Sequence, residues 1–141
     1  MPQVIGTEEQ DAFINKNRWA VVTTLRKDGS PTSSVIFYAR TGDEIIFSTT
    51  DNRLKARTLR RDPRIAVAVL DEGAPHGFVT VEGTATVQDT DVVPGHVEVN
   101  RAMRQDPAWE PPEGFAERLA ADGRVIVRVT AARVSGVPGR G

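Results

Sequence analysis

Residues 19–49 read WAVVTTLRKDGSPTSSVIFYARTGDEIIFST, and this run sets the architecture of the chain. β-branched and apolar residues fill its first seven positions, which predicts a strand, and Asp28-Gly29 then supplies a hairpin turn signal. Residues 31–40 are predicted to form the return strand, and a second tight turn leads to a third strand at 44–49. Three strands joined by tight turns predict an antiparallel meander.

The rest of the chain supplies three more strands and several short helices. Thr7-Glu8-Glu9-Gln10 reads as a capping box, which predicts a helix to about Asn17. The continuous apolar run at 65–70 predicts a strand buried on both faces, and Gly83 is a candidate bulge in the strand at 78–88. The last strand is expected at 124–130, running on toward Val134, and further helices at 52–61, after Pro94-Gly95 within 91–104, and at 115–121. Six strands, mostly antiparallel, predict an α+β fold in which the sheet closes or nearly closes into a barrel, because closure leaves few unpaired strand edges.

Composition narrows the class of protein. The chain has 141 residues, which fits one domain spanning 1–141, and its formal net charge is −1, so no chain-wide field attracts nucleic acid or an anionic membrane. The absence of cysteine excludes disulfides, thiolate catalysis and zinc sites built on sulfur. No signal-like segment and no apolar run of about 20 residues is present, so we expect a cytoplasmic protein without a membrane partner.

The segment 48–64 carries the most chemistry. Ser48, Thr49 and Thr50 end a strand, and a helix rich in cations is predicted to begin a few residues later. A helix N-terminus presents unpaired amides and about half a positive charge. Arg53 and Lys55 add cations at the end where they oppose the helix dipole, so a negative group should compensate them. This pattern predicts an anion site, most naturally for phosphate.

Two alternatives stay open on the charge pattern. Arg53, Arg57, Arg60 and Arg64 follow helical spacing and would also suit a basic face exposed to water. Arg60, Arg61 and Arg64 lie near the helix C-terminus, where cations are favourable, and are interpreted as structural or surface residues. Nucleic-acid binding is disfavoured although 51–64 carries six cations and two anions, because no strand studded with aromatic residues offers a base-stacking platform.

Other candidate residues predict no further chemistry. His76 and His96 are too few for a histidine-rich metal site and are each interpreted as surface residues. Trp109, in a proline-rich loop, is interpreted as a core anchor rather than a lid. We therefore predict no metal site and no catalytic side chain.

Four segments together resemble a known family. They are, in chain order, TTLRKDGSP (23–31), RLKARTLRRDPR (53–64), VEGTA (81–85) and RVSGVP (133–138). Their order and spacing resemble the FMN-binding split β-barrel proteins related to pyridoxamine phosphate oxidase, and within them the flavin/deazaflavin oxidoreductases, whose actinobacterial members use coenzyme F-420. The resemblance implies a six-stranded antiparallel split β-barrel with short flanking helices, a homodimer with cofactor sites between the two barrels, and an oxidoreductase.

The resemblance also implies roles for individual residues. Arg53 and Lys55 would hold the cofactor phosphate, with a hydroxyl from Thr58, which stands where some relatives are expected to have asparagine. The other implied contacts are Ser48, Thr49 and Thr50 along the ring and ribityl chain, Thr32 and Ser34 at the ring edge, and Phe78, with the tail at 137–139, from the partner subunit. The expected activity is F-420-dependent reduction of a conjugated organic substrate. An FMN-dependent oxidase or reductase, or a non-catalytic flavin or tetrapyrrole carrier, is the alternative.

Overall fold

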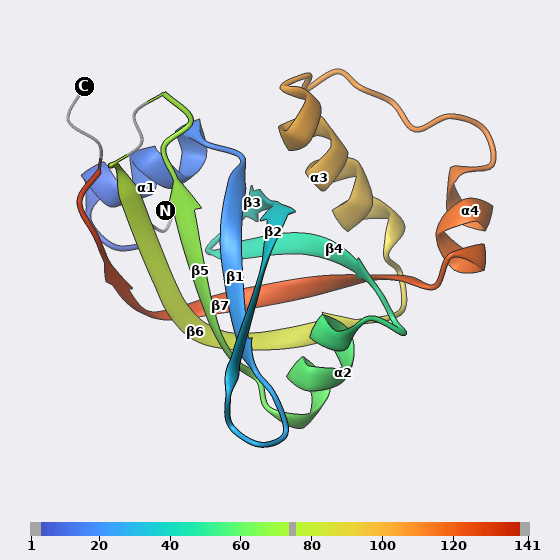
Figure 1. Ribbon diagram of the computed structural model, residues 1–141. Helices are drawn as coiled ribbons and strands as arrows, with labels where there is room; N and C mark the ends of the chain where they lie inside the picture. Colours follow the sequence, from blue (N-terminus) through green and yellow to red (C-terminus); the bar gives the residue numbers. More distant parts are fainter. Residues whose placement is uncertain (1–3, 74–75, 139–141) are drawn as a thin grey trace.

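The computed structural model describes residues 4–73 and 76–138. The described elements are drawn in Figure 1. In chain order they are α1 (Glu8–Lys16), β1 (Trp19–Leu25), β2 (Pro31–Phe37), β3 (Ala39–Thr41), β4 (Glu44–Thr50), α2 (Leu54–Arg61), β5 (Arg64–Leu70), β6 (Phe78–Gln88), α3 (Val93–Arg104), α4 (Phe115–Ala121) and β7 (Arg124–Ser135).

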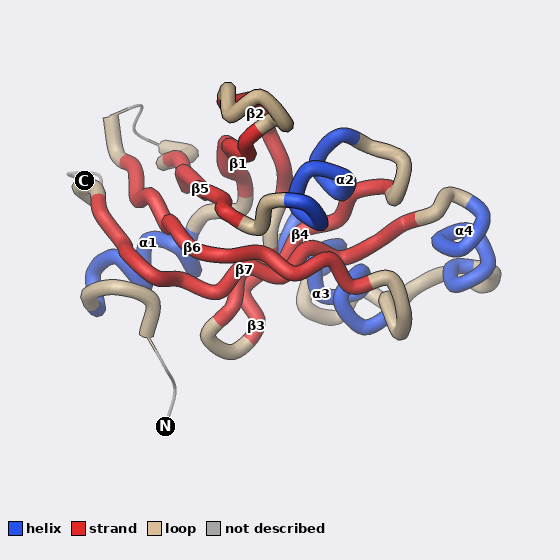
Figure 2. Tube along the Cα trace, turned by 90° about the horizontal axis from the view of Figure 1, so that it is seen from below, coloured by secondary structure: helices blue, strands red, loops and turns tan. Residues whose placement is uncertain are grey.

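All the strands belong to one antiparallel sheet in the order β2-β1-β5-β6-β7-β4-β3. The sheet curls around its apolar face, and α1 and α2 lie at opposite ends of the curl (Figures 1 and 2). β2 and β4 approach each other, and no ladder joins them in the described residues, so the barrel stays split. The predicted α+β class and the antiparallel split barrel are therefore confirmed.

The core fills the inside of this curl. Phe13 and Ile14 enter it from α1, Leu59 enters it from α2, and the inward residues of β1, β4, β5, β6 and β7 complete it. The helix α1 starts with the predicted capping box, in which Thr7 and Gln10 satisfy each other's backbone amides. No helix in the described part of the chain is long and apolar enough to cross a membrane.

The strand count is seven rather than six, because the predicted return strand at 31–40 is broken at Tyr38. The Tyr38 amide donates to the Arg18 carbonyl at 3.0 Å, and its hydroxyl donates to the Ile14 carbonyl at 2.6 Å. The side chain of Tyr38 is only 2% exposed. This anchor ends the pairing with β1 and turns the chain, so that Ala39–Thr41 pairs with β4 instead.

Two helix boundaries also differ from the prediction. α2 begins at Leu54 rather than Asn52, because the Arg53 amide donates to the Thr50 carbonyl in a tight turn and Arg53 itself is extended. α3 begins at Val93 and includes Pro94, because proline has no amide to lose in the first helical turn.

The predicted bulge at Gly83 is present. The pairing of β6 with β7 shifts register between Glu82 and Gly83. A Cβ atom at Gly83 would lie 1.9 Å from the Thr130 carbonyl oxygen, so only glycine allows the two strands to approach this closely.

β5 differs from its prediction in burial. Ile65, Val67 and Val69 are buried in the core, whereas Ala66 and Ala68 on the opposite face are only partly covered and Leu70 is exposed. The apolar run was expected to be buried on both faces, and the single chain covers only one of them.

Candidate functional site

The predicted anion-site residues meet at a cavity of about 330 Å³. Its polar lining comes from the end of β4, the start of α2 and the start of β7, and its apolar lining from β2 and α3. The polar residues are Ser48, Thr49, Thr50, Arg53, Lys55 and Arg124, and the others are Val35, Ile36, Phe37, Val99 and Met103.

Pairing between β4 and β7 places the three hydroxyl residues. Thr50 lies opposite Arg124 in the register, and the Asp51 amide then donates to the Gly123 carbonyl at 2.7 Å. The turn closed by the Arg53 amide and the Thr50 carbonyl, 3.0 Å apart, joins the strand directly to α2. The strand end and the helix start therefore line one cavity because they are neighbours in sequence.

Positive charge at this corner is not neutralised by the described protein. Neither Arg53 nor Lys55 forms an ion pair with any residue in 4–73 or 76–138. The first turn of α2 contains no acidic residue, and no side chain caps it. Two cations thus line the cavity at an uncapped helix end, which fits a phosphate group.

Lys55 is held in place within the cavity wall. Its Nζ donates to Ser34 Oγ at 3.0 Å, which ties the start of α2 to β2. Partial burial, together with the neighbouring charge of Arg53, lowers the pKa of Lys55. A bound anion would raise this pKa again, since an opposite charge favours the protonated amine.

The cations at the other end of α2 are accounted for by the protein. Arg60 pairs with Asp51 and Asp89, and Arg64 pairs with Asp62 at 2.8 Å. Arg61 is exposed at the last position of the helix. The interpretation of these three arginines as structural or surface residues is confirmed.

His96 is a site residue that sequence reasoning missed. Its side chain was expected at the surface, but it is 3% exposed, so that interpretation was wrong. Its Nε2 lies 2.8 Å from Ser48 Oγ, and its Nδ1 lies 2.7 Å from the Val92 carbonyl oxygen. The spacing of Val92, His96 and Val99 along one helical face was the available signal, because both neighbours pack into the small core beneath α3.

The contacts of His96 define the tautomer of its neutral ring. A carbonyl oxygen only accepts, so Nδ1 carries the proton and Nε2 accepts from the Ser48 hydroxyl. Burial lowers the pKa of His96, the bond to the Val92 carbonyl opposes that shift, and the charge of Arg124 reinforces it. The ring is therefore neutral at neutral pH.

Acidification is expected to destabilise the fold through His96. The pKa of His96 in the folded protein is below the ordinary 6.5. At a pH between this lowered pKa and 6.5, the unfolded chain therefore binds a proton that the folded chain does not. The free energy of unfolding then falls as pH drops below about 6.5. Urea denaturation at about pH 7.5 and 5.5 measures this, with His96→Gln expected to lose part of the pH dependence and the exposed His76→Gln to keep it. Equal pH dependence in all three proteins would contradict the assignment.

The other predicted site residues do not line the cavity. Ser34 contacts Lys55, and Thr32, two residues earlier on the same strand, does not line the cavity. Thr58 requires a correction: its side chain is completely buried on the inner face of α2, away from the cavity, and its hydroxyl has no partner among the described residues. Positions 55 and 58 lie on the same side of α2, one turn apart, but Thr58 is completely covered whereas Lys55 is only partly covered.

Phe78 lies apart from the cavity of its own chain. It begins β6, is exposed, and faces Leu70 across the β5–β6 ladder. Its amide donates to the Val137 carbonyl at 3.1 Å, so the described part of the tail lies beside it. A contact between Phe78 or this tail and a cofactor stays a prediction that requires a second subunit, and residue 139 lies outside the described residues.

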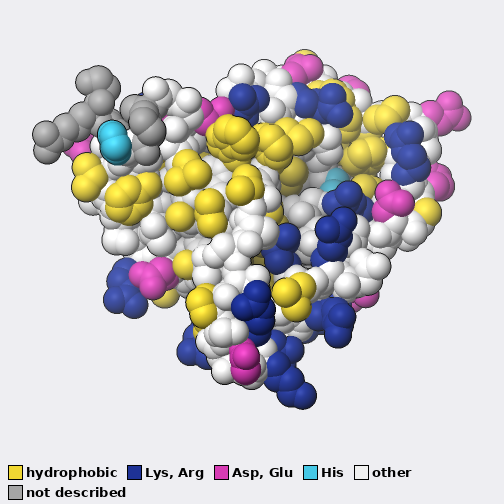
Figure 3. Space-filling model, viewed as in Figure 1, with side chains coloured by type: hydrophobic (Ala, Val, Ile, Leu, Met, Phe, Trp, Pro, Cys, Tyr) yellow, Lys and Arg dark blue, Asp and Glu magenta, His cyan; other side chains and the backbone are white. Residues whose placement is uncertain are grey.

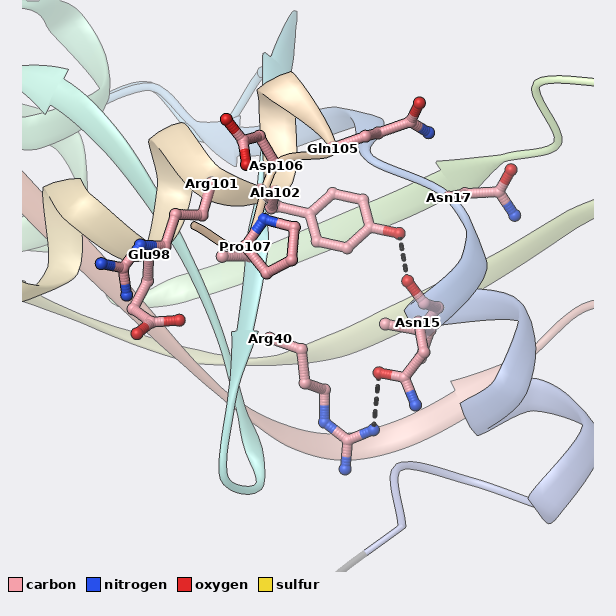
Figure 4. A pocket seen from close by; sticks show the side chains of 12 residues that line it. Asn15, Asn17, Arg40, Glu98, Arg101, Ala102, Gln105, Asp106 and Pro107 are labelled. Atoms are coloured by element: carbon pink, nitrogen blue, oxygen red, sulfur yellow. Dashed lines mark hydrogen bonds between the residues drawn. The ribbon is translucent and has the colours of Figure 1, made fainter. Parts of the chain in front are cut away.

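A larger cavity of about 510 Å³ lies between α1, β3 and α3 (Figure 4). Its two arginines are already paired within the protein: Arg40 pairs with Asp11 and donates to Asn15 at 3.4 Å, and Arg101 donates to the Trp109 carbonyl at 2.8 Å and pairs with Glu110. None of the predicted site residues lines it. The smaller cavity therefore remains the candidate site.

The described residues contain no group of three or more His, Asp or Glu side chains placed to hold a metal ion.

The chain is an antiparallel split barrel with a cation-lined cavity where β4 meets α2. The pyridoxamine 5'-phosphate oxidase family matches residues 7–138, so the chain belongs to this family of FMN-binding split barrels.

Three solved structures show the same fold. An F420 reductase is 23% identical with a TM-score of 0.72, covering 93% of this chain and 98% of that one. A conserved hypothetical protein of Mycobacterium tuberculosis is 25% identical with a TM-score of 0.77, covering 98% and 88%. A heme binding protein from Mycobacterium smegmatis is 19% identical with a TM-score of 0.70, covering 98% and 57%.

Proposed function

We propose that this protein is a coenzyme F-420-dependent oxidoreductase that reduces a conjugated organic substrate. The observation that carries the proposal is the pair of cations, Arg53 and Lys55, which have no acidic partner in the described residues and line a cavity at the uncapped start of α2. When bound, the deazaflavin supplies the hydride.

In this proposal the residues of the chain bind the cofactor and orient it. Arg53, Lys55 and the first amides of α2 hold the phosphate, and Ser34 keeps the Lys55 amine in place. The hydroxyls of β4 line the next part of the cavity, and the apolar side chains of Val99 and Met103 exclude water from its far wall. No nucleophilic side chain is needed, because the cofactor carries the reacting atom.

The choice of F-420 over FMN rests on surface charge and on the F420 reductase among the similar structures. Arg57 is exposed on α2 and extends positive charge away from the phosphate corner. This track suits the acidic oligoglutamate tail of F-420, which FMN lacks. Fluorescence titration of the purified protein with each cofactor is the test, and tight binding of FMN alone would refute the assignment.

Turnover separates the enzyme from a carrier on the same barrel. The protein loaded with reduced F-420 is expected to oxidise it faster in the presence of a quinone-like or enone-like acceptor. Tight binding with no turnover across a panel of such acceptors would favour a flavin or tetrapyrrole carrier instead.

We further propose that the protein works as a homodimer through the outer face of β2, β1, β5 and β6. Trp19 and Phe37 stack there with ring centroids 5.8 Å apart, and Val35, Leu70 and Phe78 are exposed nearby. Figure 3 shows apolar side chains gathered over these strands. A patch of this kind is unusual on a monomer, and the run at 65–70 is apolar on both faces although the single chain covers only one. A second copy covers the other face in this proposal.

A charge on this face is expected to separate the subunits. Leu70→Glu places a carboxylate in the apolar patch without touching the cavity, so the dimer dissociation constant should rise at least about 30-fold. Sedimentation equilibrium measures the change, and Ala116→Glu on the exposed side of α4 is the matched control. A wild-type protein that is monomeric at high concentration, or a Leu70→Glu variant that dimerises as wild type does, would contradict the interface.

A further inference from the structure

The hydrogen bond between Ser48 and His96 has a defined donor and acceptor. His96 is buried, and its Nδ1–H donates to the Val92 carbonyl. Nε2 therefore accepts a hydrogen bond from the Ser48 hydroxyl. A hydroxyl has one proton and two lone pairs. With its proton directed at His96, Ser48 presents only lone pairs to the cavity that it lines.

Arg124 supplies hydrogen-bond donors beside the Ser48 hydroxyl. Its Nη1 lies 3.5 Å from Ser48 Oγ, at the outer limit of a hydrogen bond, and it forms no ion pair within the described parts of the chain. A guanidinium has five donors and no acceptor. One wall of the cavity therefore holds an acceptor and a donor side by side.

We propose that His96 is a positioning residue that orients the Ser48 hydroxyl as an acceptor, so that Ser48 and Arg124 together recognise an imide edge, in which an N–H lies beside a carbonyl. The N–H donates to Ser48 Oγ, and the carbonyl accepts from Arg124. Flavins and deazaflavins both carry such an edge on the pyrimidine part of the ring. The inference rests on the proposed function, and it assigns the ring to the Ser48 wall and the phosphate to the Lys55 corner.

The arrangement also predicts how pH acts on recognition. The charged group facing His96 is Arg124 from β7, while β4 contributes the neutral Ser48 and β3 contributes the apolar Ala39 nearby. A protonated His96 donates from both nitrogens, so the Ser48 hydroxyl must accept from it and turn its own proton toward the cavity. The site then faces the imide N–H with a donor, and affinity for the ring falls.

Binding constants of three probes test the proposal. F-420, FMN and inorganic phosphate, which lacks the ring, are titrated into the wild type, Ser48→Ala, His96→Phe and the double variant, with phosphate followed by amide NMR shifts. Each single variant should raise the Kd for both cofactors by roughly 2- to 12-fold, the range of one hydrogen bond, and leave phosphate affinity unchanged. The double variant should lose little more than either single one, because both act through the same hydroxyl.

Two further measurements do not depend on whether His96→Phe folds. The ¹⁵N shifts of His96 in the wild type should show the proton on Nδ1, and the opposite tautomer would overturn the proposal. His96→Gln keeps an acceptor for Ser48 and should restore most of the cofactor affinity, without the loss that the wild type shows when the pH falls below the lowered pKa of His96.

Other outcomes are equally decisive. Unchanged cofactor affinity in Ser48→Ala, or equal losses for the cofactors and for phosphate in His96→Phe, would overturn the imide subsite. Failure of the proposed function has a different signature, because there the wild type binds neither cofactor, or Lys55→Ala changes nothing.

Discussion

Lys55→Ala and Arg53→Ala are each expected to weaken cofactor binding by about 1.5–3 kcal/mol, which is roughly 10- to 150-fold in Kd. Each removes one charge-assisted hydrogen bond to the phosphate, and each leaves the helix end without that cation. Lys55 should show the larger effect, because it is half-buried and held at 3.0 Å from Ser34, whereas Arg53 is exposed.

Matched controls separate this effect from the loss of any positive charge. Lys16→Ala removes an exposed lysine from the last turn of α1, and Arg61→Ala removes an exposed arginine from the last turn of α2. Both should leave the Kd nearly unchanged, since surface substitutions cost little. Fluorescence titration at fixed ionic strength gives the values. If Lys55→Ala and Arg53→Ala bind as tightly as wild type, neither residue holds the phosphate.

Gly83→Ala is expected to lower the free energy of unfolding by about 3 kcal/mol, at the upper end of the cost of overpacking a tight site. The added Cβ would lie 1.9 Å from the Thr130 carbonyl oxygen, and that atom belongs to the backbone of β7, which has no flexible end to move aside. The two strands must separate at the bulge, and β7 also carries Arg124 to the cavity.

Urea denaturation measures the loss, with Gly73→Ala as the matched control. A Cβ at Gly73 meets only Asp71 Oδ1 at 3.5 Å, and its φ is not positive, so this change should be nearly neutral. A Gly83→Ala protein as stable as wild type would show that the bulge tolerates a side chain.

Local parts of the structure could be predicted because their causes lie within a few residues. The capping box of α1, the turn at Asp28-Gly29 and the alternation of the strands depend on backbone preferences of adjacent positions. The position of the β4 hydroxyls beside Arg53 and Lys55 could be predicted for the same reason, since the end of β4 and the start of α2 are separated by only three residues. Chain continuity alone brings Ser48 and Lys55 near one another.

Other features depended on which surfaces pack together. His96 became buried because α3 lies against β4, and Gly95 lies so close to β7 that a Cβ there would be 2.9 Å from Ile126. Arg124 reaches the cavity through the β4–β7 register, and the buried Tyr38 divides one predicted strand into two. Thr58 is completely covered although Lys55, one turn earlier on the same side of α2, lines the cavity.

Hydrogen bonds and side-chain periods within an element repeat over two to four residues, so neighbours in the chain determine them. Contacts between elements join residues tens of positions apart, as Ser48 and His96 are. Their geometry depends on how the whole sheet curls and on which helix covers which strand. Only the packed chain determines those two things, because burying the shared apolar face is what selects one arrangement among many.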